Sequence, residues 1–251
     1  MRKYILSVAA LVLLLQTTYT TQASNQKEQV IKSSVLPTAT ISAGLKEALN
    51  QGVAEGVSKL EKKDGFYKDP AVKILLPKEF NQVEKTLRSA GLGSLVNQSI
   101  KLINRAAEDA VSSAGPIFVK AITAIDFNDA MGILLGDEKS ATKYLKQKTE
   151  NSLAAAFEPQ IEASLKKVGA DVAWNNMITK YNLISKTKVN DDLANYVTEQ
   201  TLNGVYTMIG DKEADIRHNK SARNTLVLKE VFALQDNKLA NPAKKVISII
   251  K

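Results

Sequence analysis

The chain has 251 residues and a formal net charge of +8, with no cysteine and a single histidine. This composition excludes a disulfide-stapled scaffold, a thiolate metal site, a cysteine nucleophile and a zinc site built on several histidines. Hydrophobic residues make up 44% of the chain, enough for a sizeable core, whereas 6% aromatic residues, 12 glycines and 6 prolines are too few for a turn-rich β-sandwich. A mostly helical domain remains.

Residues 1–23 carry the three-part pattern of a secretory signal peptide. The positive start Arg2-Lys3 precedes an apolar run of 11 residues, Ile5 to Leu15, and the segment ends in Thr21-Gln22-Ala23. Because a membrane-spanning helix needs about 20 apolar residues, we expect cleavage after about Ala23 rather than a permanent anchor. The mature chain is then exported to the periplasm or cell envelope, soluble after cleavage, and begins with a flexible leader over residues 24–40.

Apolar residues then recur every three or four positions from Ile41 to Leu60, which predicts an amphipathic helix over 41–60. Gly44, Gly52 and Gly56 fall on or beside its apolar stripe. Because glycine costs about 1 kcal/mol relative to alanine in a helix, their presence predicts that another backbone packs closely there.

A turn-rich segment follows that helix and leads into a short apolar alternation. Val72, Ile74 and Leu76 alternate with other residues between Pro70 and Pro77. Period two between two prolines is typical of extended backbone, and the run is too short and isolated for a sheet. We therefore expect one extended arm, near residues 70–77, laid over the helical core.

The rest of the chain is predicted to be helical, and the apolar arc of residues 92–114 is wide enough for a central helix with neighbours on several sides. The expected helices cover 77–91, 92–114, 117–125, a short helix from an N-cap at Asp126 to Gly136, 138–157, 161–168, 171–181, 191–209, 214–218 and 222–234. Pro159 is expected to kink or split the helical segment around it. No repeat or linker divides the chain, so we predict an all-α, single-domain multi-helix bundle over 41–235, with a C-terminal tail over 236–251.

The sequence contains no complete catalytic motif and no nucleic-acid motif. No phosphate-binding glycine loop or calcium loop is present, and His218 lies in a charged, solvated segment. Lysines alternate with acids, as in residues 211–213, which is typical of a solvated surface rather than a nucleic-acid site. We therefore assign no catalytic residue, no metal, no cofactor and no nucleic-acid partner. An unknown protein or small molecule is the expected partner, and the oligomeric state is left open.

Arginine is rare in this lysine-rich chain, since only 5 of its 34 basic residues are arginine. Arginine offers a rigid fork of several donors, which lysine does not. We therefore predict that Arg105, Arg217 and Arg223 hold carboxylates or helix ends inside or beside the core.

Short motifs over residues 40–235 follow a recognisable order. They are Gly44 to Leu49, Asp64-Gly65-Phe66, Leu76-Pro77, Asn104 to Glu108, Phe127 to Ala130, Ala141-Thr142-x-Tyr144, Phe157-x-Pro159, Asp192 to Thr198, Ile216-Arg217, Arg223 and Val231-Phe232. In this order they resemble a bacterial family known as domain of unknown function 4197 (DUF4197). The resemblance implies an exported helical protein and no assigned activity.

The resemblance also implies a candidate cluster of polar residues. Its members are Asn104, Arg105, Glu108, Asp129, Thr142, Tyr144, Asp192, Arg217 and Arg223. Two interpretations stay open: a buried network that fixes the register of the helices, or a pocket where Asn104, Glu108 and Tyr144 meet a polar ligand. Asn104 and Glu108 are four residues apart, hence on one helix face, which fits both.

Three functions follow from these observations. The first is a non-enzymatic binding or interaction module of the periplasm or cell envelope. The second is a hydrolase or lyase with a pocket near Asn104 and Glu108, in which Glu108 or Asp129 acts as a base while Arg105 or Arg217 holds an anion. The third is weak attachment to a membrane surface through helix 41–60 or the apolar residues 246–250.

Overall fold

The computed structural model describes residues 36–185 and 192–240, and within these ranges the chain is helical with no β-strand. Its α-helices are α2 (Thr38–Leu60), α3 (Asn81–Ser89), α4 (Gly93–Val111), α5 (Ala114–Ala124), α6 (Ala130–Leu134), α7 (Ser140–Val168), α8 (Ala170–Ile184), α9 (Leu193–His218) and α10 (Leu226–Ala240), with 3₁₀ turns at Lys78–Phe80 and Lys220–Ala222. The all-α fold class is confirmed. The expected signal peptide, the leader up to residue 35 and the apolar residues 246–250 lie outside the described residues.

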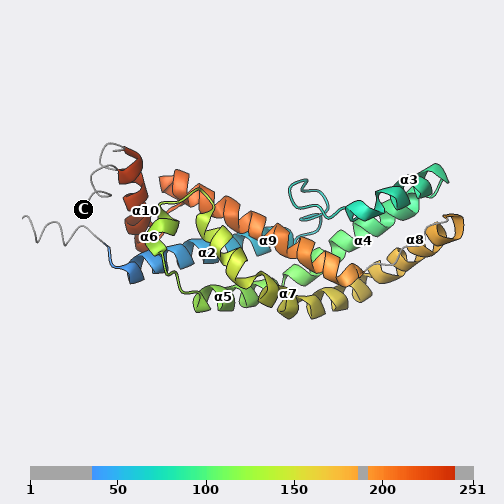
Figure 1. The fold of residues 1–251 in the computed structure, drawn as a ribbon, viewed down its shortest axis with the longest axis horizontal. Coiled ribbons are helices and arrows are strands. Elements are labelled where there is room, and N and C mark those ends of the chain that lie inside the picture. Colours follow the sequence, from blue (N-terminus) through green and yellow to red (C-terminus); the bar gives the residue numbers. More distant parts are fainter. Residues whose placement is uncertain (1–35, 186–191, 241–251) are drawn as a thin grey trace, which may run out of the picture. The chain divides into compact units, whose positions relative to one another are not determined.

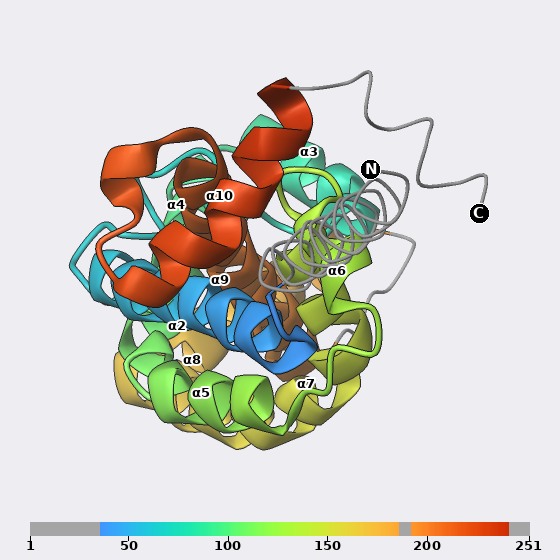
Figure 2. The ribbon, with the colours of Figure 1, turned by 90° about the vertical axis from the view of Figure 1, so that its left-hand side faces the viewer.

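Helix α2 begins at Thr38, three residues earlier than expected, and packs through its glycines. A Cβ added to Gly52 would lie 2.8 Å from Cα of Ile209 on α9, and one added to Gly44 would lie 2.6 Å from the Val231 side chain on α10. Figure 1 shows α2 and α9 running alongside one another, and Figure 2 shows α10 crossing α2. The predicted close approach of another backbone is confirmed at Gly52, whereas Gly44 and Gly56 lie against the side chains of Val231 and Met208.

Gly52→Ala should therefore destabilise the protein, although alanine is the better helix former. We expect the unfolding free energy to fall by about 1–3 kcal/mol, because the new methyl group meets the α9 backbone rather than a movable side chain. Gly115→Ala is the matched control, since a Cβ at this α5 position meets nothing within 4 Å and should be neutral or slightly stabilising. Urea denaturation of both variants is the measurement, and a Gly52→Ala protein as stable as the wild type would contradict the packing explanation.

Helix α4 is the central helix that its wide apolar arc predicts. It packs against α3, α5, α7, α8 and α9. Its buried residues include Ile103 and Ala107, which are fully inaccessible to solvent, and the polar residues Asn104 and Glu108. Helix α7 forms the most extensive contact with α9 and also covers α4, α5 and α6. The core of the described domain therefore lies among α4, α7 and α9.

The short helix α6 begins later than the sequence suggests. Asp126 is not its N-cap; the cap is Asp129, whose Oδ1 accepts a hydrogen bond of 2.8 Å from the Gly132 amide. Both aspartates precede a short apolar stretch, so spacing alone does not separate them. The backbone carbonyl of Asp126 instead accepts a hydrogen bond from the Tyr144 hydroxyl.

Helices α7 and α9 are each continuous at positions where the sequence predicts an interruption. Pro159 lies inside α7 and does not split it. Pro159 and Ala155, whose carbonyl loses its usual partner at position 159, are both exposed, so water can take the place of the missing amide. The predicted interruption of α9 at residues 210–213 is wrong, because Gly210 and Glu213 are both buried in its packed face.

The expected arm is extended and joins no sheet. Residues 73–77 have no regular secondary structure, and Val72, Ile74 and Leu76 are buried whereas Leu75 is 57% exposed. The arm leads through a 3₁₀ turn at Lys78–Phe80 into α3, which ends next to Gly91 in a left-handed conformation with φ +78°. This chain path places one face of the arm on α4 and the other in solvent.

Candidate functional site

The nine candidate residues separate into two buried networks and three local contacts. One network, which we call the arm network, contains Asn104, Arg105 and Glu108, and the other, the helix-end network, contains Thr142, Arg217 and Arg223. Asp129, Tyr144 and Asp192 each make a contact elsewhere. The expected single cluster is thus not assembled.

Asn104 holds the arm as a neighbouring strand would. Its Oδ1 accepts a hydrogen bond of 2.9 Å from the Ile74 amide, and its Nδ2 donates to the Ile74 carbonyl at 2.7 Å. Nδ2 also donates to the Ile100 carbonyl one turn earlier in α4. Because Asn104 is fully buried, these bonds satisfy both polar groups of Ile74 where water has no access. One side chain therefore replaces the partner strand that the arm lacks.

Glu108 fixes the turn before the arm from the same face of α4. Its carboxylate accepts hydrogen bonds of 3.2 Å from the amides of Asp64, Phe66 and Tyr67. Arg105 bridges this carboxylate to that of Asp64, which sits in a left-handed conformation with φ 73°. Aspartate is one of the few residues that adopt this conformation readily. Glu108 is 5% exposed, so its charge is compensated by Arg105 and three backbone donors.

The charge of Asp64 should make stability pH-dependent in strong acid. Hydrogen bonds from Lys68 and Arg105 lower the pKa of Asp64 from 3.8 to about 2. The unfolded chain therefore binds this proton first as the pH falls, so the stabilisation is fully present above pH 3.8 and is lost as the pH approaches 2. Asp64→Asn, which keeps the left-handed conformation accessible, should show a smaller loss of unfolding free energy across this window in urea titrations. An unchanged pH profile would show that these hydrogen bonds are not responsible.

The helix-end network joins the end of α6 to the start of α7 through one ion pair on α9. Glu213 accepts hydrogen bonds from the amides of Ala141 and Thr142, at 2.9 and 2.7 Å, and from the Thr142 hydroxyl at 2.6 Å. It thereby caps α7, because the side chain of the N-cap residue, Lys139, makes no capping hydrogen bond. A carboxylate at a helix N-terminus also interacts favourably with the helix dipole.

Arg217 compensates the buried charge of Glu213 from one turn further along α9. Its Nε and Nη2 donate to Glu213 Oε1 at 2.9 and 2.7 Å. Its Nη1 and Nη2 donate to the carbonyls of Leu134 and Ile133 at 2.6 and 3.1 Å, and Nη1 also reaches Gln235 on α10. The side chain is 1% exposed. Arg217 therefore holds a carboxylate and a helix end together, as predicted.

Arg223 closes the end of α9 in a similar way. It donates to the carbonyls of Ile216 and Arg217, both at 2.9 Å, and forms an ion pair of 2.8 Å with Asp236. The hydrogen bonds from Arg223 lower the pKa of Asp236 below its ordinary value. The prediction that Arg105, Arg217 and Arg223 hold carboxylates or helix ends is confirmed.

The three remaining candidates make local contacts. Asp129 and Asp192 are helix N-caps, which accept hydrogen bonds from the amides of Gly132 and Asn195. Tyr144 donates to the Asp126 carbonyl at 2.8 Å and lines a pocket of about 410 Å³ between α5 and α7. Asn104 and Glu108 do not line that pocket. The structure therefore does not bring Asn104, Glu108 and Tyr144 together.

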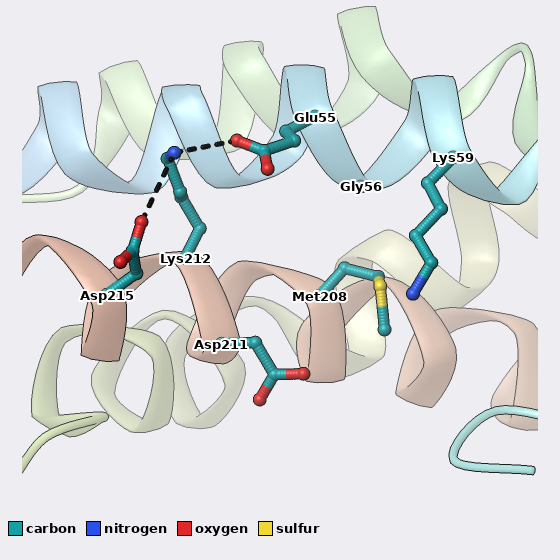
Figure 3. Close-up of a pocket in the computed structure, with 7 residues that line it drawn as sticks. All are labelled: Glu55, Gly56, Lys59, Met208, Asp211, Lys212 and Asp215. Atoms are coloured by element: carbon teal, nitrogen blue, oxygen red, sulfur yellow. Dashed lines mark ion pairs between the residues drawn. The ribbon is translucent and has the colours of Figure 1, made fainter. Parts of the chain in front are cut away.

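Carboxylates line a groove between α2 and α9, but they already form ion pairs with lysines in and around this groove. Lys212 lies between Glu55 and Asp215, at 2.8 and 3.6 Å, as the dashed lines in Figure 3 show. The hydrogen bond to Glu55 raises the pKa of Lys212 above its ordinary value. Of the other charged residues lining this groove, Asp211 pairs with Lys139 and Lys59 pairs with Asp69. The space between two carboxylates that a substrate would need is thus occupied by a lysine.

A pocket of about 370 Å³ lies between the arm, α3 and α4, and we call it the arm pocket. Its lining residues are Tyr67, Lys73, Leu75, Leu76, Lys78, Asn81, Glu84, Arg88, Asn97 and Ile100. The residues on either side of Ile74 thus face the pocket while Ile74 itself is bound to Asn104. Asn104 and Glu108 do not line this pocket.

The sequence was compared with family models, curated proteins and solved structures. A family model described as a protein of unknown function, DUF4197, matches residues 35–233. The chain belongs to the DUF4197 family. No curated protein and no solved structure matches it.

Several of the motifs that carry the DUF4197 resemblance contribute residues to these two networks. Asp64, Phe66 and Asn104 to Glu108 form the arm network, whereas Thr142, Arg217, Arg223 and Phe232 surround the helix-end network. Within the described residues no group of three or more histidine, cysteine, aspartate or glutamate side chains is placed to hold a metal ion. The same residues include no helix long and apolar enough to cross a membrane.

Sequence reasoning missed four members of the networks: Asp64, Glu213, Gln235 and Asp236. Glu213 carried a usable signal, since it precedes Arg217 by four residues and so shares a helix face with it. The run 211–213 instead suggested a solvated surface, which is wrong for Glu213 because this residue is fully buried. Asp64, Gln235 and Asp236 meet their arginines only through the tertiary fold, for which the sequence offers no spacing rule.

Proposed function

We propose that this DUF4197 protein is an exported, non-enzymatic binding module of the periplasm or cell envelope, and that the arm pocket is its ligand site. The observation that carries the proposal is the anchoring of the arm. Asn104 and Glu108 hold the arm and its preceding turn from beneath, and Tyr196 of α9 donates a hydrogen bond of 2.9 Å to the Leu75 carbonyl. Asn104 and Glu108, first considered as ligand contacts, instead bind the backbone of the arm and of the turn before it.

This anchoring prepares the arm pocket for a ligand. Leu75 is 57% exposed although its carbonyl and both polar groups of its neighbour Ile74 are hydrogen-bonded. An exposed leucine on an immobilised backbone loses little conformational entropy when a ligand covers it. The volume of about 370 Å³ falls within the range of small-molecule sites, which is about 300–1,000 Å³.

The hydrolase alternative has less support. Glu108 is 5% exposed and its oxygens face backbone amides and Arg105, so it has no open side toward a substrate. Asp129 accepts a hydrogen bond at the first turn of α6. The two proposed bases thus lie at different helices, and neither lines the arm pocket, the groove between α2 and α9 or the pocket between α5 and α7. The structure offers no pair of carboxylates flanking an open space in these positions.

Membrane attachment through helix 41–60 also has little support. The apolar stripe of α2, including Leu45 and Val53, is buried, and its glycines lie against α9 and α10. Among the described residues none of the exposed large apolar side chains lies on α2: they are Leu75 on the arm, Val119 on α5, Val172, Leu183 and Ile184 on α8, and Leu226 on α10. Attachment by residues 246–250 stays a prediction.

Export is tested by fractionating a bacterial host with two membranes that expresses the full chain. We expect the periplasmic fraction to contain a protein whose intact mass, measured by mass spectrometry, is that of a chain beginning at Ser24. Ala23→Phe should block processing, because signal peptidase needs a small residue before the cleaved bond. Ala39→Phe, beyond the signal, should be processed normally. Full-length wild-type chain confined to the cytosol would refute the export component.

A further inference from the structure

We infer that the arm pocket binds an anionic amphiphile, a small molecule with a carboxylate or phosphate group attached to a short apolar chain. This inference rests on the proposed binding function and adds the chemical class of the ligand. Three observations support it: positively charged side chains line the pocket, apolar side chains lie beside them, and contacts with Tyr67 and with the anchored arm fix the positions of these groups.

The pocket has an excess of positive charge. Lys73, Lys78 and Arg88 line it together with one carboxylate, that of Glu84. Arg88 already pairs with Glu84 at 2.8 Å and donates to Asn97 at 2.9 Å, so Glu84 does not neutralise the lysines. In the described part of the chain the side chain of Lys78 forms no ion pair. Like charges gathered in a concave site attract a counter-ion, since low-dielectric walls focus their field.

The ring of Tyr67 contacts two cations beside the pocket. The Lys73 ammonium lies 4.2 Å from the centroid of the Tyr67 ring, and the Arg105 guanidinium carbon lies 5.9 Å from it. The ring holds Lys73 at the pocket wall by a cation–π interaction, without supplying a negative charge of its own. The ammonium group therefore stays available to an anion.

The apolar surface lies next to these cations. Leu75, Leu76 and Ile100 line the same pocket, and Leu76 and Ile100 are 7% and 8% exposed, whereas Leu75 is open. An inorganic anion would leave this leucine in water. A ligand that carries an apolar chain would cover it, with a gain of about 25 cal/mol for each Å² removed from water. Charge and apolar surface together therefore favour an amphiphile over a bare anion.

The test compares probes that share one chain and differ in the head group. Octanoate, octyl phosphate, octanol and octyltrimethylammonium, each below its micellar concentration, are titrated into the full chain by calorimetry, with inorganic phosphate as the head group alone. We expect octanoate or octyl phosphate, or both, to bind at least tenfold more tightly than the neutral and cationic probes. Their binding should weaken as salt is raised, because exposed charges are screened.

Two pairs of variants locate the site. Lys78→Glu should weaken binding of the anionic probes about tenfold, and Asn97→Trp, which fills the pocket, should abolish it. Lys180→Glu and Asn176→Trp change exposed residues of α8 in the same ways and should leave binding unchanged. Urea denaturation of all four variants verifies that they fold.

The outcomes separate the inference from the proposed function. Binding of one anionic probe only would identify the head group and support the inference. Equal binding of octanol, tighter binding of the cationic probe, or inorganic phosphate binding as tightly as octyl phosphate would overturn the anionic amphiphile while leaving a ligand site in the pocket. If no probe binds, or if Asn97→Trp binds like the wild type, the proposed site itself is wrong.

Discussion

Replacing Arg217 with methionine should lower the unfolding free energy by about 3–5 kcal/mol, the largest change that we expect from a single substitution in this protein. Arg217 is 1% exposed and Glu213 is fully buried, so methionine leaves a carboxylate without its counter-charge. The change also removes the hydrogen bonds that Arg217 donates to the carbonyls of Ile133 and Leu134 at the end of α6, although Ile133 keeps one of 3.2 Å from the Gly136 amide. Urea denaturation followed by circular dichroism measures the effect.

Three further variants decide whether the ion pair is the cause. Arg88→Met removes an exposed arginine and should cost less than about 1 kcal/mol. Arg217→Lys keeps the positive charge but loses the planar guanidinium group with its several donors. It should also destabilise the protein, because one ammonium group cannot reach Glu213 and the carbonyls of Ile133 and Leu134 together. Glu213→Gln combined with Arg217→Met should cost clearly less than the sum of the two single changes, since no charge is then left unpaired. An Arg217→Met protein within 1 kcal/mol of the wild type would refute this description of the network.

The helical fold could be predicted from the sequence because the apolar residues repeat with the helical period. The stripe of α2, the wide arc of α4 and the period-two arm each correspond to an element of the structure. Errors arose where local signals conflicted with tertiary contacts. Gly210 and the charged residues after it looked like a helix break, but the fold buries Glu213 to cap α7, and this contact keeps α9 continuous.

The candidate site was predicted less well, for a related reason. Spacing along the chain correctly placed Asn104 and Glu108 on one helix face, and the scarcity of arginine correctly indicated that Arg105, Arg217 and Arg223 hold carboxylates or helix ends. Neither the spacing nor the scarcity of arginine indicates which segment of the chain these side chains contact. The pairing of Arg105 with Asp64 spans 41 positions, and the bond from Ala141 to Glu213 spans 72. Only the packing of α4 and α9 against other segments determines such pairs, so one apparent cluster became two networks.

The second large effect is expected from Glu108→Ala in the arm network. We expect a loss of about 3 kcal/mol or more, because the change leaves three buried or half-buried amides unpaired and removes one carboxylate from Arg105. Glu162→Ala, at an exposed position of α7, is the matched control and should change stability by less than about 0.5 kcal/mol. Thermal and urea denaturation measure both variants.

The sign of this change separates a structural carboxylate from a catalytic one. A catalytic acid or base is held in an environment that does not favour its charge, so its removal commonly leaves stability unchanged or raises it. A carboxylate that anchors the arm should instead lower stability when removed, and it should also weaken binding of the anionic probes, because Tyr67 and the arm would no longer be held at the pocket wall. A Glu108→Ala protein at least as stable as the wild type would contradict the anchoring role and would return Glu108 to the hydrolase alternative.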